Sequence, residues 1–198
     1  NTKCLSNLKS SSLAMLMYAD TYNGLTYNYC GAQWYDKMYS FYWTGALMWN
    51  GFLPKGSAVI HCPRMHSISS LAPISASDLR YYWGYGVIYN PTDYNTVAGY
   101  GQWVMQNGNL FSFDTKKVHQ PTIFPLLSDS YKASAVAYEN TEIASIHRGQ
   151  VTVRHSGRIN QGYMDGHAQA VTPFELREKV APIGMKMVAY QDENGNYM

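Results

Sequence analysis

The residues best suited to chemistry lie together near the C-terminal end of the sequence. His155 is followed by nine residues and then by Asp165, Gly166 and His167. Imidazole and carboxylate groups are common ligands of transition metals. His155, Asp165 and His167 therefore define one candidate metal site, and a metal-dependent hydrolase is one hypothesis. Further imidazoles that could join such a site belong to His61, His66, His119 and His147.

The same residues also fit a structural role. Asp-Gly is a favoured pair in hairpin turns because its backbone readily takes positive φ. A histidine beside such a turn can hydrogen-bond to a neighbouring carbonyl. On this interpretation Arg154 and His155 close a strand, and Asn160 and Asp165 tie their side chains to the backbone. We expect this role, with no catalytic residue and no bound metal, because short motifs often occur without the function they suggest.

Other catalytic signatures are not visible in the sequence. It has no Gly-x-Ser-x-Gly elbow, no phosphate-binding glycine loop and no His-Glu-x-x-His pattern. Its acids are too scattered to indicate a paired-carboxylate site. Residues 192–196 gather oxygen ligands around a glycine, as calcium loops do, but lack the full spacing and the closing Glu. We expect no enzyme and no cofactor, with calcium or another metal as the alternative.

Composition bounds the class of protein further. A chain of 198 residues predicts one domain. A net charge of +2, with charged residues at 14%, does not indicate a nucleic-acid partner. Tyrosine is unusually frequent, with 18 residues, and it suits half-buried surfaces and binding faces.

The densest aromatic run offers a second function. Alternation along a strand would put Tyr81, Trp83 and Tyr85 on one face. If these rings are exposed, they could stack on sugars, and the chain would be a carbohydrate-binding module. We favour burial in the core, because large aromatic side chains dominate core packing.

The coarse pattern predicts an α+β protein in which a helix precedes a sheet. The helix is expected over 2–20, and Asn23–Gly24 ends it. A second helix is expected over 34–49 and a third over 174–180. Strands are expected at 58–62, 80–89, 122–127, 150–154, 168–171 and 185–189. Pro125 places the strand over 122–127 at an edge or a bulge.

Two segments of the chain resemble one family. The stretch 154–167 resembles the C-terminal signature of prepilin-like proteins, in which a histidine, nine residues and Asp-Gly follow one another. The segment 4–20 is similar to the part of those proteins that follows their N-terminal membrane helix. The resemblance implies a pilin-like or type II secretion pseudopilin-like structural subunit. Residues 1–22 would be the C-terminal half of its first helix, packed on an antiparallel sheet within a globular head of residues 23–198.

The same resemblance implies a location and partners. A basic leader and an apolar membrane helix are expected upstream, with the protein anchored in the cell envelope or displayed at the cell surface. Its partners would be other pilin-like subunits and the secretion or assembly machinery. The run 161–164 departs from the apolar residues usual in relatives. We therefore expect a less buried strand there, with Gly162 marking a bulge.

The three cysteines allow three single pairings, and the sequence alone does not choose among them. Export to the envelope makes oxidation available. On the pilin-like layout, Cys4 lies where the helix projects away from the head, whereas Cys30 and Cys62 lie inside it. We expect a Cys30–Cys62 disulfide with Cys4 free.

Overall fold

The computed structural model describes residues 1–27, 29–30, 41–64, 85–87, 102–106, 110–129, 151–183 and 190–191. Its helices are α1 (Thr2–Thr21), α2 (Trp43–Trp49), α3 (Pro173–Val180) and the 3-10 turns η1 (Ala58–Ile60), η4 (Thr115–Lys117) and η6 (Ala181–Ile183). Its strands are β1 (Tyr29–Cys30), β2 (Phe41–Tyr42), β3 (Gly86–Val87), β4 (Gln102–Gln106), β5 (Leu110–Asp114), β6 (Pro125–Ser128), β7 (Val151–Thr152), β8 (Ile159–Tyr163), β9 (Ala168–Val171) and β10 (Tyr190–Gln191).

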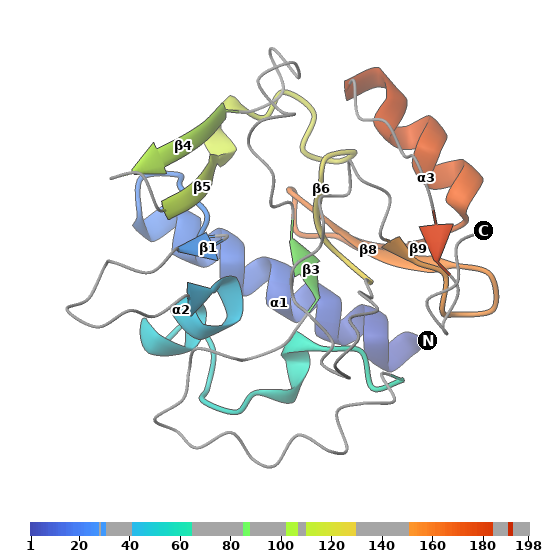
Figure 1. The fold of residues 1–198 in the computed structure, drawn as a ribbon, viewed down its shortest axis with the longest axis horizontal. Helices are drawn as coiled ribbons and strands as arrows, with labels where there is room; N and C mark the ends of the chain where they lie inside the picture. The colour runs from blue at the N-terminus through green and yellow to red at the C-terminus, as the bar shows by residue number, and fades with distance from the viewer. Residues whose placement is uncertain are drawn as a thin grey trace.

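The described strands form two antiparallel sheets of four strands and one parallel pair. The sheet orders are β2-β1-β5-β4 and β3-β6-β8-β9, and β10 pairs with β7. In Figure 1 the β8–β9 hairpin lies between α1 and α3. The expected α+β class, with an N-terminal helix against an antiparallel sheet, is confirmed.

Helix α1 buries one face and exposes the other. Its buried residues recur at the spacings of three and four that an amphipathic helix requires; they are Cys4, Asn7, Leu8, Ser11, Ser12, Ala14, Met15, Tyr18 and Ala19. The helix ends where Asn23 (φ 58°) and Gly24 (φ 88°) adopt left-handed backbone. The Gly24 N–H donates to the Ala19 carbonyl at 2.6 Å. The helix expected over 2–20 and the turn at 23–24 are confirmed.

Several other elements differ from expectation. No strand forms over 58–62, where a strand was expected. Residues 58–60 form the turn η1, and α1 side chains bond to backbone carbonyls of this segment. The second helix begins only at Trp43, since residues 41–42 pair with β1 as β2. The expected strands over 168–171 and helix over 174–180 are confirmed as β9 and α3. Residues 34–40 and 185–189 lie outside the described residues.

Helix α1 packs directly across β8, and Gly162 makes this possible. A Cβ at Gly162 would collide with the Ser12 hydroxyl and would lie 3.5 Å from Leu8 Cγ. All five residues of β8 are buried, so the expectation of a less buried strand here is wrong.

The bulge near Gly162 belongs to the neighbouring strand. Pro125 pairs with Tyr163 and Leu127 with Gly162, which leaves Leu126 as the extra residue of β6. Strand β6 is an inner strand of its sheet, so Pro125 lies beside a bulge and not at an edge. A bulge accommodates the missing N–H of proline within a sheet.

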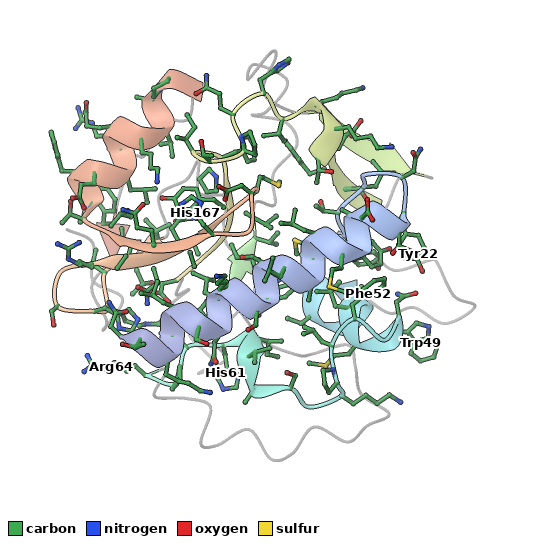
Figure 2. All side chains as sticks on the ribbon, turned by 180° about the vertical axis from the view of Figure 1, so that it is seen from behind. Tyr22, Trp49, Phe52, His61, Arg64 and His167 are labelled. Atoms are coloured by element: carbon green, nitrogen blue, oxygen red, sulfur yellow. A yellow bond between two sulfur atoms is a disulfide. The ribbon has the colours of Figure 1, made fainter. Side chains whose placement is uncertain are left out.

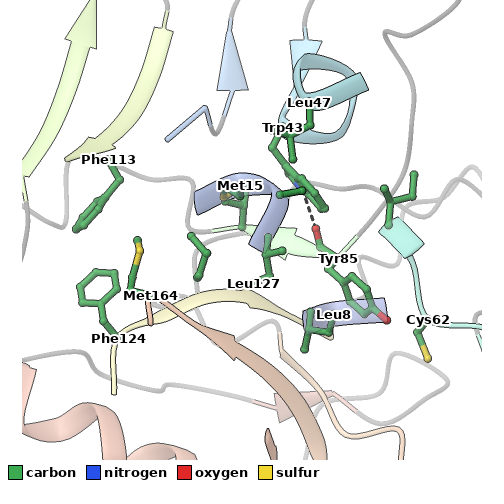
Figure 3. Packing of buried hydrophobic residues seen from close by; sticks show 14 of the residues in the cluster. Leu8, Met15, Trp43, Leu47, Cys62, Tyr85, Phe113, Phe124, Leu127 and Met164 are labelled. Carbon is green, nitrogen blue, oxygen red and sulfur yellow. Dashed lines mark hydrogen bonds between the residues drawn. The ribbon is translucent and has the colours of Figure 1, made fainter. Parts of the chain in front are cut away.

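The hydrophobic core joins α1 to the sheets and to α2. Leu8 and Met15 of α1, Trp43 and Leu47 of α2, and Leu127 of β6 are all fully buried, and Figure 3 shows them around Tyr85. The Trp43 indole N–H donates to the Tyr85 carbonyl at 2.9 Å. Among the described helices, none combines the length and the apolar character that a membrane span requires.

We predict that Gly162→Ala lowers the free energy of unfolding by about 1–3 kcal/mol, because the added methyl overpacks the contact with α1. Ser12→Ala alone should have little effect, since its buried hydroxyl has no hydrogen-bond partner among the described residues. The double variant should regain most of the loss, because Ser12 Oγ is the atom that collides. Urea unfolding of the four proteins tests this. If the loss of unfolding free energy in the double variant equals the sum of the two single losses, the close approach of α1 to β8 is contradicted.

Candidate functional site

The two halves of the signature lie at opposite ends of β8. His155 is in the turn before the strand, where its N–H and that of Arg154 donate to the Arg158 carbonyl, each at 3.1 Å. Asp165 lies in the turn after the strand. Because a strand rises about 3.3 Å per residue, β8 holds His155 apart from Asp165 and His167. These three side chains therefore do not come together into the candidate metal site, and the nine-residue spacing corresponds to the length of β8 with its turns.

The Asp165 end is a hairpin turn, as predicted. The Gly166 N–H donates to the Tyr163 carbonyl at 2.9 Å, and the Tyr163 N–H donates to the His167 carbonyl at 2.9 Å. Gly166 has φ 85°, the left-handed conformation that closes a three-residue hairpin loop. The Asp165 carboxylate accepts the His167 backbone N–H at 3.1 Å, which confirms its expected role.

The side chains of Asp165 and His167 also contact each other near the surface. Their Oδ1 and Nδ1 atoms are 2.5 Å apart, and the His167 ring stacks on Tyr163 at 4.3 Å between centroids. Partial burial acts to raise the pKa of Asp165. Hydrogen bonds from the backbone N–H and the ring of His167, together with the charge of that ring, outweigh burial and lower the pKa of Asp165. The arrangement stabilises a turn.

The His155 end is buried and polar. His155 Nε2 lies 3.3 Å from Asp129 Oδ2, and the two side chains are 2% and 0% exposed. The same nitrogen lies 3.4 Å from Cys62 Sγ. Asp129 directly follows β6, which carries its carboxylate to this point. A buried carboxylate of this kind requires partners, and His155 is one of them.

Asn160 joins this end through its backbone. Its N–H donates to Asp129 Oδ2 at 2.9 Å, and its carbonyl accepts the Asp129 N–H at 3.0 Å. Its side-chain amide is buried and has no hydrogen-bond partner among the described residues. The expected bond from the Asn160 side chain to the backbone is therefore wrong. Asn160 contributes instead through its backbone, because its N–H and its carbonyl both bind Asp129.

The disulfide joins Cys4 to Cys62 across a sequence separation of 58, with Cα atoms 5.1 Å apart. The expected Cys30–Cys62 pairing is therefore wrong. Cys4 does not project away from the head, because it lies on the buried face of α1. A loop of this length contributes about 4 kcal/mol by closure entropy.

Two polar side chains of α1 explain why Cys62 reaches Cys4. Asn7 donates to the carbonyls of Ala58 and His61 at 3.3 and 3.2 Å. Ser11 donates to the Val59 carbonyl at 2.8 Å. These bonds dock the segment before Cys62 along the same helix face that carries Cys4.

Tyr85, the residue directly before β3, closes the site. Its ring is 2% exposed, and its hydroxyl donates to the Cys4 carbonyl at 2.9 Å. Burial, and then the charge of Asp129, raise the pKa of Tyr85, while the charge of Arg154 opposes them. Tyr85 therefore stays neutral and presents no face on which a sugar could stack. Tyr81 and Trp83, the other rings of that expected surface, lie outside the described residues.

Together these residues form what we call the buried ligand cluster: Cys4, Cys62, Asp129 and His155. One ligand atom of each lies within 4.8 Å of the others, and all four residues are buried. Sequence reasoning selected His155 and the cysteines but missed Asp129. The only signal for it is a carboxylate placed directly after a buried apolar strand, since Asp129 follows Pro125–Ser128.

His61 and His119 are not part of this cluster. Burial lowers the pKa of His61, whose backbone carbonyl binds Asn7, and His119 is exposed. His66, His147 and the possible calcium loop at 192–196 lie outside the described residues. Comparison with protein-family models, curated proteins and solved structures finds no match to this chain.

We predict that peptide mapping of the unreduced protein recovers Cys4 linked to Cys62. Cys30→Ser should leave this link intact, whereas Cys62→Ala should lower the free energy of unfolding by up to about 4 kcal/mol, because it opens the loop. Recovery of a peptide that links Cys30 to Cys62 would contradict the pairing.

We also predict that Asp165→Ala lowers the free energy of unfolding by about 0.5–1 kcal/mol at neutral pH, since its hydrogen bonds are exposed. The folded-state pKa is lowered from 3.8. The charge of Asp165 therefore adds to the free energy of unfolding above pH 3.8. This contribution is lost as the pH falls through the pKa that Asp165 has in the folded state. Asp165→Asn, which keeps an acceptor oxygen, isolates the charge. Urea unfolding across this pH range should show wild type and Asp165→Asn converge in acid; a constant difference would contradict the assignment.

Proposed function

We propose that this chain is a non-catalytic structural subunit of a pilin-like or pseudopilin-like assembly in the cell envelope or at the cell surface. The architecture supports the proposal. A helix of 20 residues leads the chain and packs across an antiparallel sheet. The resemblance of 4–20 and 154–167 to prepilin-like proteins points to the same class.

The outer face of α1 is the observation that carries the proposal. Met17 is 61% exposed, and Leu13 is 43% exposed although its side chain also lies beside Gly166 of the hairpin turn. They are four residues apart, so they are neighbours on one helix face. Burying such side chains against another protein surface is favourable. In a pilin-like assembly the first helices of neighbouring subunits pack together, and this face is available for that contact.

The role of the signature supports a structural function. A Cβ at Gly166 would lie 2.8 Å from Leu13 Cδ2 and 3.5 Å from Leu16 Cδ1. The glycine of the Asp-Gly pair therefore lets the hairpin turn rest against α1, while Gly162 does the same within β8. The glycines of the signature let the helix lie close to the sheet, and the Asp165 carboxylate holds the turn.

The disulfide supports an exported location. Stable disulfides are typical of oxidising compartments and rare in the reducing cytosol. Our proposal places an apolar membrane helix before α1 in the full-length protein, with other pilin-like subunits and the assembly machinery as partners.

We predict that Met17→Lys in the full-length protein, expressed in its native cells, strongly reduces self-assembly. A lysine here should cost the fold little, because the site is exposed and a cation suits the last turns of a helix. The measurement is the yield of subunit-to-subunit cross-links in the envelope fraction, with electron microscopy of surface filaments.

Phe174→Lys is the matched control, since Phe174 is an apolar side chain, 70% exposed, on α3. It should assemble as the wild type does. Equal loss in both variants would remove the special role of the α1 face. A wild-type protein that forms no cross-links to itself or to other envelope subunits would refute the proposed function.

A further inference from the structure

The buried ligand cluster contains groups that a structural disulfide does not require. A disulfide needs only the two sulfur atoms, yet an imidazole and a carboxylate stand beside this one. Sulfur, imidazole nitrogen and carboxylate oxygen are the ligand types of zinc in proteins. We propose that reduction of the Cys4–Cys62 disulfide converts the buried ligand cluster into a binding site for one zinc-type divalent ion.

The distances fit a tetrahedral ion. Zinc bonds of 2.0–2.3 Å place neighbouring ligand atoms roughly 3.3–3.8 Å apart. His155 Nε2 lies 3.3 Å from Asp129 Oδ2 and 3.4 Å from Cys62 Sγ. All four ligand atoms lie within 4.8 Å of one another. Once the bond between the sulfurs opens, small side-chain movements suffice to surround an ion.

Asp129 is prepared for such a role. Its Oδ2 is held by the Asn160 N–H at 2.9 Å. Its Oδ1 is buried and has no hydrogen-bond partner in the described part of the chain, although a buried carboxylate oxygen is costly without one. Carboxylates that ligate a metal are commonly hydrogen-bonded themselves, so the bond from Asn160 orients the carboxylate whose Oδ2 lies beside His155.

The buried charges balance when the ion is bound. Two thiolates and the Asp129 carboxylate bring three negative charges, and a divalent ion brings two positive ones. The remaining positive charge is that of Arg154, which is buried at 6% exposure. It acts on the Tyr85 hydroxyl together with Asp129, and that hydroxyl contacts Cys4.

The chemical step is a two-electron reduction followed by metal binding. A dithiol donor gives two electrons and two protons to the Cys4–Cys62 bond and leaves as a disulfide. Both cysteines are then thiols, and metal binding releases their two protons to solvent. His155 binds through Nε2 as a neutral ring, with its proton on Nδ1.

Both cysteines are next to exposed residues in the chain. Lys3 precedes Cys4 and is exposed, and Pro63 and Arg64 follow Cys62 and are exposed. Figure 2 shows Arg64 and His61 beside the N-terminal end of α1. The chain beside each of the two cysteines therefore reaches the surface.

The test compares the chain with its disulfide intact and after anaerobic reduction by a water-soluble phosphine, which ends as the phosphine oxide. Each form is titrated with Co²⁺ and then with Zn²⁺. The reduced protein should bind one ion per chain, with the visible bands of tetrahedral cobalt and a thiolate charge-transfer band, both removed by Zn²⁺. The disulfide form should show neither. Absence of the thiolate band after reduction, or equal binding by both forms, would overturn the proposal.

Variants identify the ligands. Asp129→Asn and His155→Gln should each weaken Zn²⁺ binding at least about 10-fold, since even residues behind a ligand contribute that much. Cys62→Ser should reduce the charge-transfer band by about half, because the band scales with the number of thiolates. Cys30→Ser and His167→Gln are the matched controls and should bind as the wild type does. Loss of the thiolate charge-transfer band in either control would overturn this ligand set. The controls give this answer even if the variants at Asp129, His155 and Cys62 do not fold.

Discussion

The close approach of α1 to β8 is the contact on which the rest of the structure depends. It requires a residue without a side chain at Gly162 and small residues such as Ser12 on the facing side of the helix. Interiors are packed too densely to absorb an extra methyl group without movement. With the helix seated at this depth, Cys4 meets Cys62, and Asn7 and Ser11 meet the carbonyls of residues 58–61.

Features with a local cause could be predicted from the sequence. Helix α1 follows from its periodicity, α3 from Pro173 and the capping box of Thr172 and Glu175, and the hairpin from Asp-Gly. The η1 turn, the partner of Cys4 and the role of Asp129 could not. Each depends on segments that are distant in the chain and meet only once α1 is docked, and no local pattern encodes that encounter.

The His155–Asp165 signature therefore has two unlike ends. At one end, a buried imidazole meets a carboxylate and a sulfur atom. At the other, an exposed carboxylate and imidazole close a turn. The sequence invites the view that these polar groups form one site, because they are near one another along the chain. An extended strand separates what a helix or a loop would have brought together.

The bonds from Asn7 and Ser11 end on backbone oxygens of residues 58, 59 and 61. Every amino acid supplies such an oxygen, so these three contacts place no demand on which side chains follow. The helix, by contrast, must present an amide and a hydroxyl at fixed positions. Evolution can therefore rewrite the surface of this segment freely, provided that positions 7 and 11 keep their hydrogen-bond donors.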